Sequence, residues 1–251
     1  ETGRQEMEHI EKLREIIEHS NRIVFFGGAG VSTESGIPDF RSKDGLYNQH
    51  DVQFEEYKPE YLLSKECLYH NPKVFYEFYR QKMDTRNIKP NDAHIKLAKL
   101  EAMGKLSAIV TQNIDGLHQK AGSKNVYEIH GTTMRNYCVK CKSEYDVNYI
   151  FDSQDKIPVC KICGRPVRPD VTLYGESLPA EAWDNSMAAI LKADTLIIAG
   201  TSLSVYPAAS LIDYFNGDNL IVINRETTNR DKWADLVFHD SVGKILTEAI
   251  E

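Results

Sequence analysis

Short apolar runs recur along the chain, with helical patterns between them. The runs are Ile23–Phe26, Leu106–Thr111, Asn125–Glu128, Thr195–Ala199, Leu220–Asn224 and Leu236–His239. Runs this short and this rich in Val and Ile predict buried strands. Helical patterns cover about residues 91–103, 180–192, 206–216 and 242–250. Strands that lack polar alternation are covered on both faces, so the pattern predicts an α/β fold, a Rossmann-like parallel sheet with helices on both sides.

Two segments, residues 42–90 and 131–170, interrupt this alternation. The first is rich in Tyr, Phe and charge and carries a helical pattern, PKVFYEFYRQKM; the second holds four of the five cysteines. We interpret both as insertions that together form a smaller domain. The larger domain then comprises residues 1–41, 91–130 and 171–251, and a cleft is expected between the two domains.

The first twenty residues are charged throughout and lack the apolar core of a signal peptide. Met7, Ile10, Leu13 and Ile17 recur at helical spacing, which predicts an amphipathic helix packed on the core. No apolar stretch approaches the roughly 20 residues of a membrane span. We therefore expect no membrane association and a cytoplasmic location.

The formal charge of the chain is −7, from 30 basic and 37 acidic residues. An acidic chain is not attracted to a phosphate backbone, so direct nucleic-acid binding is not expected. Hydrophobic residues make up 41% of the chain, which is enough for a core and argues against global disorder.

Four cysteines form the pattern C-x2-C-x18-C-x2-C, which is typical of a zinc site. They are Cys138, Cys141, Cys160 and Cys163. Four thiolates fill a tetrahedral shell and leave no position for a reactive water, so the pattern predicts one structural zinc in a zinc ribbon. A pair of redox disulfides and a nucleic-acid-reading ribbon are the alternatives. The fifth, Cys67, is interpreted as a buried apolar residue.

Polar segments follow five of the predicted strands, where an open parallel sheet binds its ligands. These segments are Gly27–Arg41, TQNIDGLH (111–118), EIHGT (128–132), GTSLSVYPAA (200–209) and INRE (223–226). The first resembles a dinucleotide loop: backbone N–H groups of Gly28, Ala29 and Gly30 could approach a pyrophosphate. Its third glycine position is Thr33, however, and Pro38 ends the following helix early.

The other segments suit further parts of a dinucleotide. Thr201 and Ser202 offer hydroxyl donors, Asn224 and Glu226 could hold ribose hydroxyls, and Asn113 with Asp115 could read a carboxamide. Each fragment alone has a simpler interpretation, because Asn and Asp often cap helices. Five such strand ends in one sheet favour a dinucleotide site.

The chain resembles the sirtuins, a family of NAD-dependent protein lysine deacylases. The matching segments are GAGVSTESGIPDFR, TQNIDGLH, EIHG, the two C-x-x-C pairs, YGE, GTSLSVYP and INRE, in the family's order. The resemblance implies a single catalytic unit, with a small domain built from a zinc ribbon and a helical module. It also implies a protein lysine deacetylase that transfers the acetyl group to the ADP-ribose of NAD, releasing nicotinamide and 2'-O-acetyl-ADP-ribose.

By this resemblance, His130 is the general base, and Asn113 with Gln112 orients the ribose and a water. Phe40 shields the reactive ribose and Arg41 lies near the phosphates. The implied NAD-binding residues are Gly28, Ala29, Gly30, Thr33, Asp39, Phe40, Arg41, Gln112, Asn113, Ile114, Asp115, Gly200, Thr201, Ser202, Asn224, Arg225, Glu226 and Val242.

The resemblance also implies that an acetyl-lysine peptide binds as an added β-strand, along residues 171–178 and 203–207. The substrate residues are Val171, Gly175, Glu176, Val205 and Tyr206. Sirtuins that prefer succinyl-lysine carry Tyr-x-x-Arg in the small domain. Here Tyr76 fits the tyrosine, but Tyr79 stands at the arginine position and Arg80 lies about 100° further round the helix, which favours neutral acyl groups.

Other functions are weighed on the sequence. A mono-ADP-ribosyltransferase or a longer-chain deacylase could use the same scaffold. A non-catalytic NAD-binding or chromatin-type binding module could carry the same loops and zinc ribbon. A metal hydrolase is disfavoured by the filled four-thiolate site.

Overall fold

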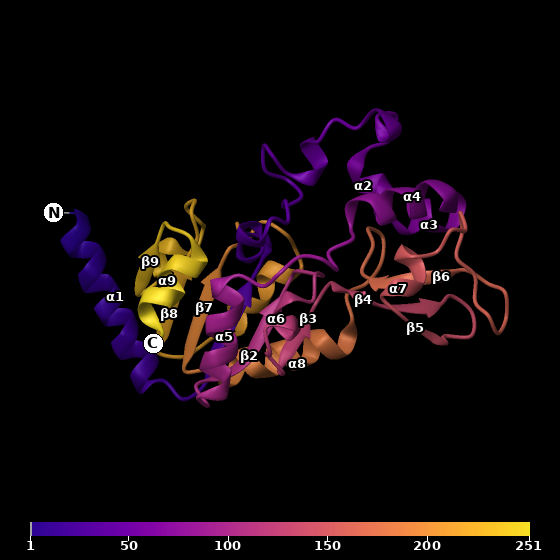
Figure 1. The fold of residues 1–251 in the computed structure, drawn as a ribbon. Coiled ribbons are helices and arrows are strands. Elements are labelled where there is room, and N and C mark those ends of the chain that lie inside the picture. Colours follow the sequence, from indigo (N-terminus) through magenta and orange to yellow (C-terminus); the bar gives the residue numbers. More distant parts are fainter. Residues whose placement is uncertain (1) are drawn as a thin grey trace.

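The computed structural model describes residues 2–251, and its centre is a six-stranded parallel sheet (Figure 1). The strand order is β3-β2-β1-β7-β8-β9. The strands are β1 Ile23–Gly27, β2 Leu106–Thr111, β3 Val126–Glu128, β7 Thr195–Ala199, β8 Asn219–Ile223 and β9 Leu236–Phe238. Each of the six predicted strands is therefore present within about one residue. The order reverses between β1 and β7, the position where doubly wound sheets bind ligands.

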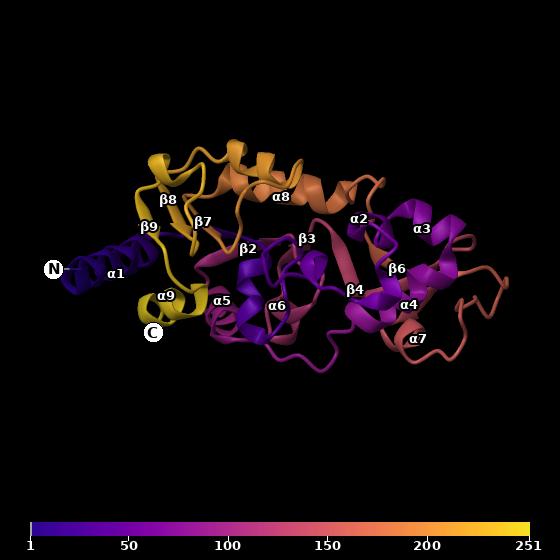
Figure 2. The ribbon, with the colours of Figure 1, turned by 90° about the horizontal axis from the view of Figure 1, so that it is seen from above.

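The sheet is buried on both faces, as the apolar runs predict. In β1, Ile23 and Phe25 pack into one hydrophobic cluster, whereas Val24 and Phe26 pack into another. The first cluster includes buried residues of the helices α1, α5 and α9, and the second those of α8 and η5. Figure 2 shows α8 on one side of the sheet and α5 and α9 on the other. Because successive side chains of a strand point to opposite faces of the sheet, a hydrophobic core forms on each face.

The helices of the larger domain follow the sequence patterns, with one difference. They are α1 Thr2–His19, α5 Asp92–Ala102, α6 Leu117–Lys120, α8 Ala180–Lys192 and α9 Val242–Ala249. The pattern at residues 206–216 forms a 3-10 helix instead, η5 Ala208–Tyr214. Shorter 3-10 turns are η1 Ala29–Val31, η2 Thr33–Ser35, η3 Leu46–Asn48, η4 Val52–Phe54 and η6 Asp231–Trp233.

The two insertions lie together at one end of the molecule (Figure 1). The helical one contains α2 Pro59–Leu62, α3 Lys65–His70 and α4 Pro72–Lys82; the other contains β4 Gly131–Cys138, β5 Glu144–Asp146, α7 Asn148–Phe151 and β6 Val167–Val171. The three strands form a separate antiparallel sheet, β5-β4-β6. Phe75 and Tyr79 of α4 share one hydrophobic cluster with Ile150 and Val167. The domain boundaries predicted from the sequence remain a prediction.

Among residues 2–251, no helix combines the length and the apolar character needed to cross a membrane.

Two buried histidines lie behind the ligand-binding edge of the sheet. The rings of His94 and His118 are 4.9 Å apart, and neither ring nitrogen of His118 has a hydrogen-bond partner in the described part of the chain. His94 accepts from the backbone N–H of Asn91 and so completes the cap of α5. Burial lowers the pKa of His118 to about 3 and that of His94 to about 4. Both rings are therefore neutral in the folded protein.

We expect these histidines to steepen the loss of stability in acid. The unfolded chain binds protons below the ordinary histidine pKa of about 6.5, and the folded chain does not until the pH nears 3 to 4. Each histidine then costs about 1.4 kcal/mol per pH unit within that window. His118→Leu should reduce the slope by about this amount, measured by urea unfolding from pH 6.5 to 4.5. Equal slopes in the variant and the parent would contradict the assignment.

Candidate active site

A cavity of about 790 Å³ lies at the carboxyl ends of the central strands, against the smaller domain. Such a volume is typical of cofactor-sized sites. It is lined by Gly28, Ala29, Gly30, Thr33, Asp39, Phe40, Arg41, Gln112, Asn113, Ile114, His130, Val171, Gly175, Glu176, Gly200, Thr201, Ser202, Val205, Tyr206, Asn224, Arg225, Glu226 and Val242. These include every site residue expected from the sequence except Asp115 and the four cysteines.

The floor of the cavity is formed where the loop after β1 crosses the loop after β7. A Cβ atom on Gly30 would lie 2.7 Å from the Cα of Gly200, and one on Gly28 would lie 2.8 Å from the Cβ of Thr201. Only glycine permits this approach. Gly28 N–H donates to Ala199 (3.2 Å) and Gly30 N–H donates to Gly200 (2.8 Å). These two N–H groups join the two loops, and the assignment of a pyrophosphate to the first loop stays a prediction.

Gln112 and Asn113 extend from β2 across this floor. The Nε2 of Gln112 donates to the hydroxyl of Thr201 (3.2 Å), and the Nδ2 of Asn113 donates to the carbonyl of Gly28 (2.8 Å). Each amide therefore uses its nitrogen on a neighbouring loop. We infer that the amide oxygens are the groups left to interact with a ligand.

Asp115 lies beneath the cavity wall and is buried. One carboxylate oxygen accepts from the hydroxyl of Ser32 (2.6 Å), and the other accepts from the backbone N–H of Leu117 (2.9 Å) at the start of α6. Ser32 also lies 3.4 Å from the Nε2 of His94. Asp115 thus bonds to the first turn of α6, while its role toward a ligand stays a prediction. Ser32 and His94, which link it to the first loop and to α5, were not identified from the sequence.

His130 stands between the strand end of β3 and the start of β4. Its Nδ1 lies 3.0 Å from the carbonyl oxygen of Gln112. A carbonyl only accepts, so Nδ1 carries the hydrogen of the neutral ring and Nε2 keeps a lone pair. Burial lowers the pKa of His130, the carbonyl of Gln112 opposes this, and the charge of Arg41 lowers it further. At neutral pH the ring is thus an unprotonated base.

The strands β4 and β6 bring the expected peptide edge to His130. Gly131 pairs with Val171, and the N–H of Thr172 donates to the carbonyl of His130 (2.8 Å). Gly131 has φ +81°, and a Cβ atom there would lie 2.2 Å from the carbonyl oxygen of Asp170. This close pairing places Val171 directly beside the base.

The turn after β6 is fixed by a buried ion pair. The side chain of Arg168 is only 3% exposed, and its guanidinium makes two bonds to Glu176, of 2.6 and 2.8 Å. Arg168 also donates to the carbonyl of Val171 (2.9 Å), and Glu176 accepts from the N–H of Leu173 (3.0 Å). Burial alone would raise the pKa of Glu176, but the bond from Arg168 lowers it overall. The Glu176 carboxylate therefore holds the turn, and its role toward a substrate stays a prediction.

The remaining expected residues surround the cavity from other loops. The amide of Asn224 donates to the carbonyl of Glu226 (3.0 Å), and Ser202 bonds to Ser204 (2.6 Å). Asp39 accepts from Ser42, while Phe40 packs against the ring of Tyr47 at 5.4 Å. Lining residues that the sequence analysis missed include Tyr47, Leu63, Met83 and Tyr174. The aromatic and helical composition of residues 42–90 was the available signal for three of them.

The helix α4 contributes a different tyrosine from the one expected. Tyr76 is fully buried, donates to the carbonyl of Val167 (2.6 Å) and lies outside the lining. Tyr79, one turn later, lines the cavity together with Met83. The Nε of Arg80 donates to the carbonyl of Ile150 (2.9 Å), away from these residues. The absence of arginine from the α4 part of the described lining agrees with a neutral acyl group.

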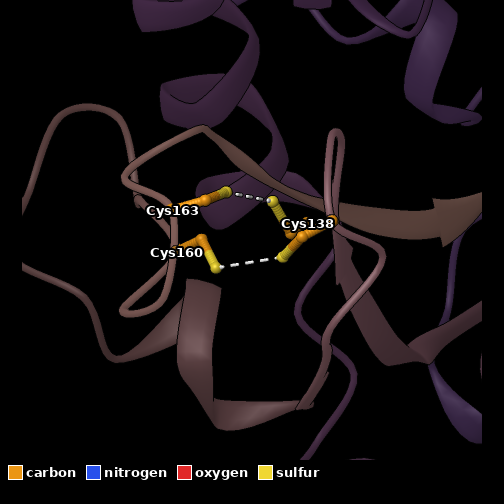
Figure 3. Close-up of side chains that lie close together, drawn as sticks. Cys138, Cys160 and Cys163 are labelled. Atoms are coloured by element: carbon orange, nitrogen blue, oxygen red, sulfur yellow. Dashed lines mark hydrogen bonds between the residues drawn. The ribbon is translucent and has the colours of Figure 1, made fainter.

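The four cysteines converge as their spacing predicts (Figure 3). Their sulfurs all lie within 4.8 Å of one another, with Cys138 3.3 Å from Cys163 and Cys141 3.6 Å from Cys160. These distances are too long for disulfides, whose S–S bond is about 2.05 Å, and are close to the edge of a tetrahedron around zinc. A hydrogen bond from Tyr145 lowers the pKa of Cys160 to about 6. The donor set fits one structural zinc ion.

The parallel sheet, the crossed glycine loops, the partly buried His130 and the four-cysteine centre define an α/β dinucleotide-binding protein with a structural metal module. The Sir2 family model matches residues 28–207. An NAD-dependent protein deacetylase of Clostridium perfringens is 57% identical over 244 residues, covering 96% of this chain and 98% of that protein. One from Clostridium acetobutylicum is 54% identical, covering 97% and 99%.

Solved structures agree with this. A Sir2 structure with deacetylated p53 peptide and 3'-O-acetyl ADP-ribose has a TM-score of 0.85 at 34% identity, covering 96% of this chain and 99% of that one. A Sir2–p53 peptide–NAD+ structure has a TM-score of 0.82 at 36% identity, covering 95% of each. The chain belongs to the Sir2 family, the sirtuins, as its motifs indicate.

Removing one zinc ligand should unfold the smaller domain first. Cys138 and Cys160 belong to the same hydrophobic cluster as α3 and α4, so loss of the metal loosens both insertions. Cys138→Ala should lower the zinc content from one ion per chain to near zero and reduce solubility, measured by metal analysis and limited proteolysis. Cys67→Ala, outside the four-cysteine centre, is the matched control and should retain zinc. A folded, active, zinc-free Cys138→Ala protein would contradict a structural role.

Breaking the Arg168–Glu176 ion pair should lower the free energy of unfolding. Glu176→Leu leaves a buried guanidinium uncompensated, so the free energy of unfolding should fall by about 3 kcal/mol. The control is Asp213→Ala, which breaks the exposed Arg230–Asp213 pair and should cost less than about 1 kcal/mol. Chemical denaturation measures both changes. Similar losses in the two variants would mean that the buried pair does not fix the turn.

Proposed function

We propose that this protein is an NAD-dependent protein lysine deacetylase. It transfers the acetyl group of acetyl-lysine to the ADP-ribose of NAD and releases nicotinamide. The observation that carries the proposal is His130, an unprotonated base placed between the glycine-loop floor and the Val171 edge of one cavity. The names of the curated relatives support the same activity.

The cavity suits NAD in size. Its volume of about 790 Å³ is in the range of cofactor sites. Its lining includes the cationic residues Arg41, Lys43 and Arg225 beside the acidic residues Asp39, Glu176, Glu226 and Asp240, so a pyrophosphate would be held close to the cations and not by the net charge of the cavity. Asn224 and Glu226 lie at the end of β8 and are the candidate ribose contacts.

Each step of the proposed reaction is assigned to particular residues of the cavity. NAD supplies a ribose carbon that becomes electrophilic when nicotinamide leaves, and the acetyl-lysine oxygen attacks it. Asn113 and Gln112, fixed by their bonds to Gly28 and Thr201, orient the ribose and a water. Nε2 of His130 would take a proton from the ribose hydroxyls, which would allow the 2'-oxygen to attack the acyl carbon. A water then adds to that carbon, its C–N bond to lysine breaks, and the acetyl group stays on the ribose oxygen. Phe40 and Ile114 are apolar walls that exclude competing water.

The peptide is expected to bind as an added strand between residues 171–178 and 203–207. Backbone pairing would give affinity with little sequence demand, and Val171 would pack on the acyl-lysine stem. The acidic net charge of −7 argues against direct nucleic-acid binding. A cytoplasmic location stays a prediction. ADP-ribosyl transfer to a protein is the second outcome that the same activated ribose permits.

The direct test follows the masses of an acetyl-lysine peptide with and without NAD. We expect loss of the acetyl group only with NAD, together with equal amounts of O-acetyl-ADP-ribose and nicotinamide. Deacetylation without NAD would indicate a hydrolase. A gain of ADP-ribose on the peptide or protein would indicate a transferase. A succinyl-lysine peptide should react more slowly, because Arg80 is directed away from the α4 part of the cavity wall.

His130→Ala should lower kcat for deacetylation by at least about 100-fold while NAD binding persists. In the parent, kcat/KM should fall as the pH drops through the lowered pKa of His130, and this acid limb should lie below pH about 6.5. His19→Ala, which removes an exposed histidine at the end of α1, is the control and should keep the profile. A His130→Ala variant with a near-normal rate would contradict the base assignment.

A further inference from the structure

Tyr174 joins three parts of the molecule that are distant in sequence. Its backbone N–H donates to the carbonyl of Leu63 (3.0 Å), and its carbonyl accepts from the N–H of Lys65 (2.9 Å). These bonds form an isolated parallel bridge between Tyr174 and the helical insertion. The next residue, Gly175, lines the cavity within the proposed peptide edge. The main chain of Tyr174 is therefore held in place.

The side chain of Tyr174 reaches the loop that follows β1. Arg41 donates to the Tyr174 hydroxyl (2.8 Å), and the hydroxyls of Tyr174 and Tyr47 lie 2.6 Å apart. The guanidinium also lies over the ring of Tyr47, 5.5 Å from its centroid. Burial and the bond to Tyr174 raise the pKa of Tyr47, so its hydroxyl stays neutral. The Tyr174 hydroxyl, beside the proposed peptide edge, thus orients the guanidinium of Arg41, which lies on the loop proposed to bind the dinucleotide.

Arg41 is exposed and long, so it loses rotamer freedom when a ligand fixes it. An oriented guanidinium binds an anion with a smaller entropic cost than a free one. Tyr174 is 39% exposed, so a ligand that packs on its side chain and orders it also favours an anion beside Arg41. By thermodynamic linkage, an anion beside Arg41 favours that ligand by the same factor.

We infer that the Tyr174 hydroxyl is a positioning group for Arg41, and that it makes NAD binding and peptide binding mutually strengthening. The inference rests on the proposed function, because it takes NAD and an acetyl-lysine peptide as the two ligands. The hydroxyl itself acts only through Arg41. Tyr174→Phe removes the hydroxyl and retains the ring and both backbone bonds, so it isolates this one interaction.

The experiment measures binding of carba-NAD, which has no cleavable glycosidic bond, by calorimetry with and without acetyl-lysine peptide. In the parent we expect the peptide to tighten carba-NAD about fivefold or more, with the reciprocal effect on the peptide. In Tyr174→Phe this factor should fall towards one, while each ligand alone still binds. In turnover, KM for NAD should rise several-fold with kcat changed less than about twofold.

Two variants serve as controls. Tyr214→Phe makes the same chemical change on η5, outside the cavity lining, and should keep the parental factor. Tyr47→Phe retains the ring beneath Arg41 and the Arg41–Tyr174 bond, and should lose less coupling than Tyr174→Phe.

The outcomes separate this inference from the proposed function. Two results would overturn the positioning role and leave the deacetylase proposal standing. In the first, the peptide still tightens carba-NAD in Tyr174→Phe by the parental factor. In the second, Tyr174→Phe binds both ligands more weakly, but that factor is unchanged. The positioning role would also be overturned if the parent deacetylates with NAD but the peptide does not change its affinity for carba-NAD. A parent that lacks NAD-dependent deacetylation would overturn the proposed function, and failure to bind either ligand would overturn both.

Discussion

The crossing of two backbone loops between β1 and β7 is the constraint on which the site depends. Gly30 and Gly200 approach so closely that neither position has room for a side chain, and the N–H of Gly30 donates to the carbonyl of Gly200. The crossing brings Gln112, Asn113 and Thr201 together, because the amides of β2 bond to both loops. A larger residue at either glycine would separate the strands at their carboxyl ends and remove the cavity floor.

A second constraint joins the cavity to the smaller domain. The pairing of β4 with β6 carries His130 to Val171, and the Arg168–Glu176 pair fixes the turn that follows. This buried ion pair contributes little to the net free energy of unfolding, but it restricts the turn to one conformation. His130, Val171 and the four-cysteine centre are therefore connected through two short strands, so loss of the metal should also disturb the cavity.

Hydrophobic periodicity and cysteine spacing predicted the strands and the four-cysteine centre. They did not predict contacts between side chains that are far apart in the sequence. The strands are predicted because each carries its own apolar signal, and the cysteines because their spacing is local. Tyr76 and Tyr79 both fit a helical pattern, and only the packing of α4 on β6 decides which one faces the cavity. The bonds of Gly28 N–H to Ala199 and of Tyr174 to Arg41 join segments far apart in the chain, so no local pattern contains them.

The shared core of the two insertions has a consequence for the order in which the chain acquires structure during synthesis. Phe75 and Tyr79 leave the ribosome well before Ile150 and Val167, the residues that cover them. Likewise, β1 gains β7 as its neighbour only after most of the chain has been made. Contacts this distant form slowly and leave aromatic surface uncovered in the interval. Production of this protein should therefore depend on chaperone capacity and zinc supply more than its final stability suggests.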